Sequence, residues 1–269
     1  ELPEGIPVSC GGGDNMMGAI GTGNVTDGKL TMSLGTSGTL YAYSSKPIID
    51  PKGAIAGFCS STDGWLPLLC TMNCTVATEL MRDLVGRSLD EFNNDLNSIP
   101  PGSGGLLTIP FFNGERTPNL PKGKASLIGL TSQNCTPAYV LRSAVEGATY
   151  ALRYGLDELN ALGLKVDKII LTGGGAKSPQ WRQIVADIFQ LPIQILKIEE
   201  GASFGAALQA LWVLIREKDN NIKLDTIITD HLAVDEGKSS LPNLECKDIY
   251  NKGYSDYQNA VNQITPLFE

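Results

Sequence analysis

The sequence predicts an α/β fold in which a mixed β-sheet is flanked by helices. Its second half alternates β-type runs with amphipathic helical runs, and its first half carries short β-type runs joined by glycine turns. Hydrophobic residues make up 42% of the 269 residues, which is enough to form a sizeable core. The length allows one large domain or two small ones.

Residues 30–34 and 39–43 form the first expected strand pair. Both runs are β-type, and the GTSG turn at 35–38 separates them, so we predict a hairpin. Residues 56–60 and 65–69 are separated by a second turn and form a further candidate pair.

Two helices are expected next, at residues 75–84 and 89–96. The proline and glycine cluster at 100–105 interrupts the chain, and we interpret it as an ordinary loop rather than a domain linker. An apolar strand follows at 106–110. Residues 111–135 form an irregular stretch, and a stretch of that length inside a compact domain usually has a function.

Glu115 and Arg116 are adjacent opposite charges within this irregular stretch. We expect them to form a structural ion pair that holds the loop. The alternative is that they brace a functional cleft.

Thr136 and Pro137 begin a long helix that Gly163 ends, because Thr is favoured as an N-cap and Pro at the first helical position. A strand is expected at 168–172. It runs directly into a glycine run at 173–176, so the sequence predicts a tight turn at the end of this strand.

Ser178 and Pro179 begin another expected helix. Its apolar face should be formed by Trp181, Ile184, Val185, Ile188 and Phe189. A strand at 192–198 and a helix from Ser203 continue the α/β pattern. Beyond Asp219 the chain is polar, and we expect a loop and a terminal helix packed on the outside.

The net charge of −8 and the pI of about 4.8 argue against a nucleic-acid-binding surface. No apolar run is long enough for a membrane span, and the first residues show no secretory signal. The chain also lacks an initiator Met and reaches a glycine-rich motif by Gly11. This abrupt start suggests a fragment of a longer protein.

The six cysteines form no C-x-x-C pair and no cluster with the single histidine, His231. A zinc site is therefore not expected. Free thiols favour a reducing compartment, so we expect a cytoplasmic protein. Cys70 and Cys74 are four residues apart, and we expect them to pack on one helix face.

Three glycine-rich turns carry the most chemical information: GGGDN at 11–15, GTSGT at 35–39 and GGGA at 173–176. None matches the P-loop or the dinucleotide-binding glycine pattern. Glycine turns with a neighbouring hydroxyl can nevertheless bind phosphate, because their exposed backbone N–H groups can approach its oxygen atoms. The simpler interpretation is that each turn only reverses the direction of a strand. Three such turns in one domain favour a nucleotide cleft.

Asp14 lies where the first glycine turn meets an apolar, potentially helical run. Its carboxylate could cap a helix N-terminus, which stabilises by about 1 kcal/mol. It could equally accept a hydroxyl proton during phosphoryl transfer, where a weak base suffices because positioning dominates. The residue alone leaves both roles open.

Taken together, these motifs resemble the C-terminal domain of FGGY-family carbohydrate kinases, and most of all the members that phosphorylate xylulose. The resemblance starts with CGGGDNMMGAIGTG at 10–23 and SLGTSGT at 33–39. It continues with PFFNGERTP at 110–118, GLT at 129–131, EG at 146–147, LTGGGAKSPQW at 171–181 and EEGASFGAA at 199–207. The matches span about residues 6–216.

The resemblance implies an actin-like, ribonuclease-H-like ATPase fold, with two such domains facing each other across a cleft. We therefore expect residues 1–269 to be the C-terminal nucleotide-binding domain, with a core at about 6–216 and a tail at 217–269. Its main partner would be the sugar-binding N-terminal domain, which is absent from this chain. A homodimer stays open, and neither a nucleic acid nor a membrane is expected as a partner.

The resemblance also implies roles for individual residues. Asp14 would be the catalytic base and would contact the sugar hydroxyl, with Asn15 beside the sugar. Gly35, Thr36 and Ser37 would meet the phosphates of ATP.

The glycine run at 173–176, called the second glycine run below, would pack against adenosine through Gly174, Gly175 and Ala176. Lys177 and Ser178 are further candidates for the same contact. Mg²⁺ would be bound to the nucleotide and held largely through water and acidic side chains, so no metal ligand is assigned to this chain.

The function implied is transfer of a phosphoryl group from ATP to a pentulose, with D-xylulose as the first choice. The alternatives are a kinase for ribulose, glycerol or gluconate, or a non-catalytic actin-like ATP-binding module. Asp14 and Asn15 beside a glycine turn argue against such a module, because a sensor needs no hydroxyl base. The isolated chain is expected to turn over no sugar.

Overall fold

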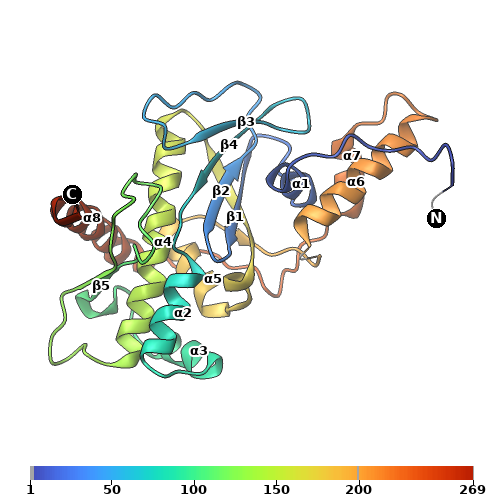
Figure 1. Ribbon diagram of the computed structural model, residues 1–269. Helices are drawn as coiled ribbons and strands as arrows, with labels where there is room; N and C mark the ends of the chain where they lie inside the picture. Colours follow the sequence, from blue (N-terminus) through green and yellow to red (C-terminus); the bar gives the residue numbers. More distant parts are fainter. Residues whose placement is uncertain (1–2, 199, 269) are drawn as a thin grey trace.

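The computed structural model describes residues 3–198 and 200–268. Its centre is a six-stranded mixed sheet with helices on both sides (Figure 1). The strand order is β3-β4-β2-β1-β7-β8. The predicted α/β architecture, a mixed sheet flanked by helices, is therefore confirmed.

The four strands from the first half of the chain are mutually antiparallel neighbours, whereas β7 and β8 run parallel to β1. Their bounds are β1 (Gly28–Leu34), β2 (Gly38–Ala42), β3 (Ala56–Cys59), β4 (Trp65–Cys70), β7 (Val166–Thr172) and β8 (Ile193–Gln194). A separate antiparallel pair is formed by β5 (Leu107–Ile109) and β6 (Ser126–Ile128).

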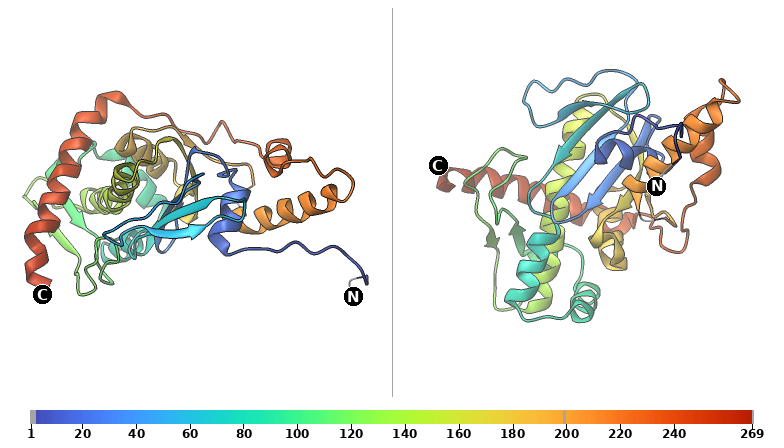
Figure 2. Two further views of the ribbon diagram at one scale, coloured as in Figure 1. Left: turned by 90° about the horizontal axis from the view of Figure 1, so that it is seen from above. Right: turned by 45° about the vertical axis from the view of Figure 1, so that its right-hand side comes forward.

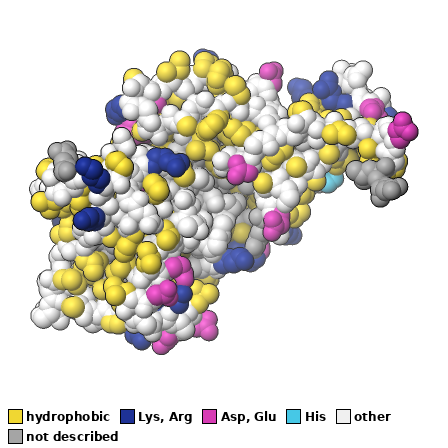
Figure 3. Space-filling view, viewed as in Figure 1, with side chains coloured by type: hydrophobic (Ala, Val, Ile, Leu, Met, Phe, Trp, Pro, Cys, Tyr) yellow, Lys and Arg dark blue, Asp and Glu magenta, His cyan; other side chains and the backbone are white. Residues whose placement is uncertain are grey.

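The helices are α1 (Asp14–Gly21), α2 (Thr75–Leu84), α3 (Leu89–Ser98), α4 (Pro137–Ala161), α5 (Pro179–Phe189), α6 (Gly201–Arg216), α7 (Leu224–His231) and α8 (Lys247–Ile264). In the part of the chain that the structure describes, none is both long and apolar enough to cross a membrane. Acidic and basic side chains are scattered over the face seen in Figure 3, without a basic patch.

The two faces of the sheet differ in chemistry because side chains alternate along β1. Leu30, Met32 and Leu34 are fully buried in the main core, which also contains the inner faces of α4 and α5. Thr31 points to the opposite face, where its hydroxyl lies 2.8 Å from the hydroxyl of Thr22 at the end of α1. The polar face of the sheet is therefore the one on which α1 lies.

Most predicted elements are confirmed, including both antiparallel strand pairs and the helices at 75–84 and 178–189. Ser178 is the N-cap of α5, and its hydroxyl accepts a hydrogen bond from the Trp181 N–H. All five residues of the predicted apolar face of α5 are buried.

One prediction of strand extent and one of an irregular stretch were inaccurate. β8 ends at Gln194 rather than near 198, because its pairing with β7 stops there; beyond it, Leu196 forms an isolated bridge with Val234 of the tail. The stretch at 111–135 contains β6, which pairs with β5.

The tail contains two helices rather than one, and they lie on opposite sides of the molecule (Figure 2). α7 packs against α6. α8 packs against α4 and α5, and its buried face consists of Tyr250, Tyr254, Tyr257 and Val261. The expectation of a terminal helix on the outside is confirmed.

The predicted helix face shared by Cys70 and Cys74 is wrong. Cys70 is the last residue of β4, whereas Cys74 is the N-cap of α2. Only Cys74 is fully buried.

α1 and α6 cross in direct backbone contact because glycines line both sides of the crossing. A Cβ atom on Gly205 would overlap the carbonyl oxygen of Met17, and one on Gly21 would overlap the carbonyl oxygen of Gly201. No larger residue fits at these two positions without moving a helix. The crossing therefore fixes the position of α1 against α6.

We predict that Gly205→Ala lowers the free energy of unfolding by about 1–3 kcal/mol, because the added methyl group forces the two helices apart. Gly237→Ala is the matched control, since its Cβ would meet only the Asp235 carboxylate at 3.5 Å. Denaturant unfolding of both variants measures the difference. Equal stabilities would contradict the close packing of α1 on α6.

We also predict that Cys59 and Cys135 react with iodoacetamide in the folded protein while Cys74 does not. Cys59 and Cys135 are exposed, whereas burial raises the pKa of Cys74 to about 12. Mass spectrometry after alkylation with and without denaturant checks this. Alkylation of Cys74 under native conditions would show that the N-terminus of α2 opens.

Candidate functional site

A hollow of about 400 Å³ lies at the ends of the central strands, on the polar face of the sheet. Its lining is rich in hydroxyl groups and glycine: Asp14, Asn15, Gly18, Thr22, Ser33, Ser37, Thr39, Tyr41, Thr172, Gly173, Gly201 and Ala202. Three residues that the sequence assigned to the site therefore line one hollow, namely Asp14, Asn15 and Ser37.

The pairing of β1 with β7 brings the two strand-end glycine turns together. Ser33 lies opposite Thr172 in a parallel register, so both strands end at the same edge of the sheet. Gly173 has a φ of 88°, and a Cβ there would approach the backbone of Leu34 to 2.7 Å. Only glycine allows the second turn to lie this close to β1.

Asp14 is the first residue of α1 and is exposed. The N-cap is Gly13, so the interpretation of Asp14 as an N-cap is wrong by one residue. Its Oδ1 accepts hydrogen bonds from the backbone N–H of Asn15 at 2.9 Å and from the Asn15 amide at 3.4 Å. Among the described residues no hydrogen bond to the other carboxylate oxygen is found, and this exposed group lines the hollow.

The GTSG turn after β1 is held through its carbonyl groups. The Gly35 carbonyl accepts from the Thr75 N–H at 2.9 Å, and the Thr36 carbonyl accepts from the Cys74 N–H at 3.1 Å. Thr36 and Ser37 are exposed, and Ser37 lines the hollow. The turn is therefore anchored on the α2 side and open on the other.

The second glycine run forms a 3₁₀ turn at Gly174–Lys177. Gly174 is exposed and has space around its Cα, whereas Gly175 and Ala176 are buried. A Cβ on Gly175 would meet Leu34 at 2.9 Å, so this glycine serves close packing.

Lys177 and Ser178 differ in what holds them. Lys177 is exposed, and its carbonyl accepts a hydrogen bond from Arg182 at 3.2 Å. The Ser178 hydroxyl donates to Asn93 Oδ1 at 2.6 Å and caps α5, so Ser178 joins α3 to the start of α5.

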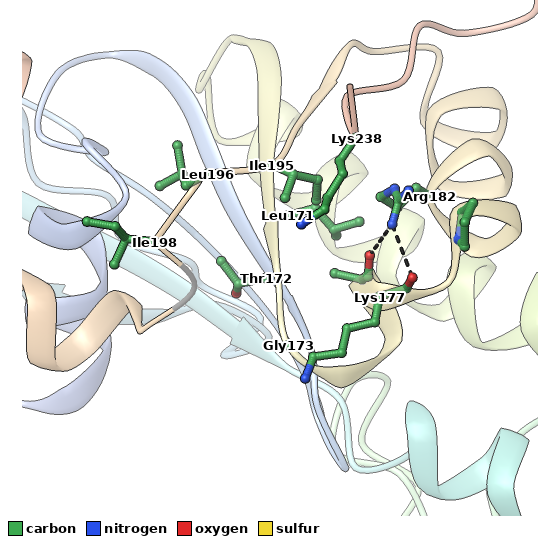
Figure 4. Close-up of a pocket in the computed structure, with 11 residues that line it drawn as sticks. Leu171, Thr172, Gly173, Lys177, Arg182, Ile195, Leu196, Ile198 and Lys238 are labelled. Carbon is green, nitrogen blue, oxygen red and sulfur yellow. Dashed lines mark hydrogen bonds between the residues drawn. The ribbon is translucent and has the colours of Figure 1, made fainter. Parts of the chain in front are cut away.

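A second hollow of about 320 Å³ lies beside the second glycine run (Figure 4). Thr172 and Gly173 line both hollows, which therefore meet at the end of β7. One wall is apolar and consists of Leu171, Ile195, Leu196 and Ile198. Ala176 and Lys177, two of the predicted nucleotide contacts, also line this hollow.

Several lining residues were not singled out from the sequence, including Thr22, Tyr41 and Thr172. Tyr41 is buried beneath the hollow, and burial raises the pKa of its hydroxyl. The available signal was the alternation along β1 and β2, which places Ser33, Thr39 and Tyr41 on the face away from the main core.

The predicted ion pair between Glu115 and Arg116 is wrong. Arg116 is exposed, and no ion pair joins it to Glu115 in the described part of the chain. Glu115 is 1% exposed and accepts hydrogen bonds from N–H groups instead. The sequence could not show that Glu115 is buried and Arg116 exposed, because the side chains of adjacent residues can point in different directions.

Among residues 3–198 and 200–268, no group of three or more His, Cys, Asp and Glu side chains could hold a metal ion. Asp14 is the one carboxylate among the described residues that line the first hollow. This donor set fits Mg²⁺ only as an ion bound mainly by a phosphate ligand and water, which is a common arrangement for Mg²⁺.

Comparison with known proteins identifies the family of this chain. Residues 30–214 match the FGGY family of carbohydrate kinases, C-terminal domain. The chain is 45% identical over 261 residues to the xylulose kinase of Haemophilus influenzae, covering 97% of this chain and 52% of that protein. It is 40% identical over 226 residues to the xylulose kinase of Streptomyces rubiginosus, covering 81% and 44%.

The crystal structure of xylulose kinase from Bifidobacterium adolescentis is similar with a TM-score of 0.77 at 34% identity, covering 91% of this chain and 47% of that one. The expected actin-like ATPase fold is thereby confirmed. The chain spans about half the length of the curated relatives it matches. It belongs to the FGGY family of carbohydrate kinases, and the part that it matches is their C-terminal domain.

Proposed function

We propose that this chain is the nucleotide-binding half of an ATP-dependent kinase that phosphorylates D-xylulose at its 5-hydroxyl. The observation that carries the proposal is the position of Asp14, whose carboxylate lines the same hollow as the GTSG turn and the end of β7. The xylulose kinases of Haemophilus influenzae and Streptomyces rubiginosus, to which the chain is similar, support this choice of sugar.

In this proposal residues 1–269 form one C-terminal domain, with a core at about 6–216 and a tail at 217–269. The partner is an N-terminal sugar-binding domain of the same protein, which would close the hollow from the other side. We propose a cytoplasmic location, which the free thiols of the described chain support.

Asp14 is proposed as the base that accepts the proton of the attacking hydroxyl, with Asn15 beside the sugar. Phosphoryl transfer has a loose transition state, so a weak base such as a carboxylate is sufficient if it is well placed. Asn15 helps to place it, because its backbone and side-chain N–H groups both donate to Asp14 Oδ1.

Gly35, Thr36 and Ser37 are proposed to bind the ATP phosphates. The carbonyls of Gly35 and Thr36 are bound on the α2 side, which leaves backbone N–H groups of the turn available on the open side. The N-terminus of α6 also meets this hollow through Gly201 and Ala202, and the positive end of a helix favours anions.

The adenosine is proposed to lie against Gly174, Gly175 and Ala176, with Lys177 and Ser178 nearby. The second hollow supports this assignment because it has an apolar wall and meets the phosphate hollow at Thr172 and Gly173. Mg²⁺ would neutralise phosphate charge when bound to the nucleotide, and Asp14 is the described carboxylate of this hollow that could reach it through water.

We predict that Asp14→Asn in the full-length enzyme lowers kcat at least about a hundredfold, which is the usual contribution of a general base. Asn keeps the shape and cannot accept the proton. Calorimetry should give an ATP affinity close to that of the wild type. Asp27→Asn removes an exposed carboxylate that does not line the hollow and is the matched control. An unchanged kcat for Asp14→Asn would refute its assignment as the base.

We also predict that the chain of 269 residues folds and binds ATP weakly but phosphorylates no sugar. The full-length protein should phosphorylate xylulose in preference to ribulose, glycerol and gluconate. A coupled assay of ADP release, run on both proteins with the four compounds, measures this. Turnover by the isolated chain would contradict the need for a second domain, and ATP binding without turnover by the full-length protein would favour a non-catalytic module.

A further inference from the structure

Glu115 is a fully buried carboxylate in the irregular stretch between β5 and β6, far along the chain from the glycine turns. The loop around it is closed by two backbone hydrogen bonds between Glu115 and Leu120, at 2.8 and 2.9 Å. Burying a carboxylate is costly unless N–H or cationic groups surround it. The hydrogen-bond partners of the Glu115 carboxylate should therefore indicate its structural role.

Among the described residues, all hydrogen-bond partners of the Glu115 carboxylate are N–H groups. Oε1 accepts from the backbone of Met72 at 2.7 Å and of Arg116 at 2.8 Å, with the Thr117 N–H further away at 3.5 Å. Oε2 accepts from the side-chain amide of Asn73 at 3.1 Å. Glu115 therefore binds two consecutive residues, Met72 and Asn73, that precede α2.

Asn73 strengthens the same connection. It is fully buried, and its amide donates to the Gly114 carbonyl at 2.6 Å while its Oδ1 accepts from the Asn113 N–H at 3.2 Å. The loop and the segment at 71–75 are thus joined by side-chain bonds in both directions.

The segment at 71–75 in turn holds the GTSG turn. Cys74 N–H donates to the Thr36 carbonyl and Thr75 N–H to the Gly35 carbonyl, at 3.1 and 2.9 Å. Thr71 adds a backbone bond to the Gly38 carbonyl at 2.8 Å and accepts the Gly38 N–H on its hydroxyl at 3.2 Å.

These bonds set the direction of the N–H groups of the turn. In a trans peptide the C=O and the following N–H point in opposite directions. Because the carbonyls of Gly35 and Thr36 point at the 71–75 segment, the N–H groups of Thr36 and Ser37 point away from it. Ser37 lines the first hollow, so the open side of the turn is the side of the site.

We propose that Glu115 is a positioning residue for phosphoryl transfer: through Met72 and Asn73 it holds the segment that orients the phosphate-binding N–H groups of Thr36 and Ser37. The inference rests on the proposed function, which assigns this turn to the phosphates of ATP. Glu115 itself does not line the hollow. Its role is to determine the geometry of a site that it does not touch.

The test is Glu115→Gln in the full-length kinase. Glutamine keeps the volume but places an NH₂ group against N–H donors, so the 71–75 segment loses part of its attachment. We expect the KM for ATP to rise roughly tenfold, as the loss of hydrogen bonds to a charged group predicts. The KM for the sugar should stay within about twofold, since the turn is assigned to ATP alone.

Glu146→Gln is the matched control. Glu146 is equally buried on α4 and accepts from Gly102 N–H, Arg142 and the hydroxyls of Ser103 and Tyr250, none of which belongs to the turn or to the 71–75 segment. It should lower thermal stability without changing the KM for ATP. An equal rise in the KM for ATP in both variants would mean that Glu115 acts only through stability, which overturns the proposal.

If Glu115→Gln does not fold, Thr71→Val tests the same connection, because it keeps the side-chain shape and removes the hydroxyl bond to Gly38. A KM for ATP unchanged in the variant that folds overturns the positioning role of this network. If instead the wild-type protein neither binds ATP nor phosphorylates a sugar, the proposed function fails, and with it the basis of the inference.

Discussion

The parallel hydrogen bonding between β1 and β7 joins the two halves of the chain at the point where the site is built. It places the ends of two strands from distant parts of the sequence at one edge of the sheet, and each strand continues into a glycine turn. Gly173 allows the second turn to lie against the backbone of Leu34, where a side chain would not fit. Without this pairing, the GTSG turn and the second glycine run would be unrelated loops.

Around this junction, one face of the sheet forms the core and the other face lines the hollow. The face that carries Leu30, Met32 and Leu34 is buried against α4 and α5 and supplies the main core. The opposite face carries hydroxyl groups, and α1 is held above it by close contact with α6. Because the core does not extend into the hollow, the polar groups that line it are not needed for the packing of the core.

In our proposal, buried polar groups that do not line the hollow also determine the geometry of the site. The Glu115 carboxylate accepts hydrogen bonds from the Met72 backbone and the Asn73 side chain, and Asn73 also donates to the Gly114 carbonyl, so both residues hold the segment that anchors the GTSG turn. Hydrogen bonds from several N–H groups make the burial of this carboxylate tolerable. The irregular stretch at 111–135 therefore supports the segment that anchors the GTSG turn and does not itself line the hollow.

Much of this protein follows from its sequence alone. Local alternation, caps and glycine turns were sufficient to predict the α/β class, the hairpin of β1 and β2 and the start of α5 at Ser178, because these features depend on neighbouring residues. The motifs also identified Asp14, Asn15 and Ser37, which the structure brings into one hollow.

Only the tertiary structure decided what depends on distant contacts. The short extent of β8 follows from where its pairing with β7 stops, and the lining role of Tyr41 and Thr172 follows from strand order. The hydrogen bonds of Glu115 depend on a segment more than forty residues away in the sequence. The neighbouring charge of Arg116 therefore led to the wrong prediction of an ion pair. Sequence patterns report local geometry, whereas burial and hydrogen-bond partners are set by which segments meet in the folded chain.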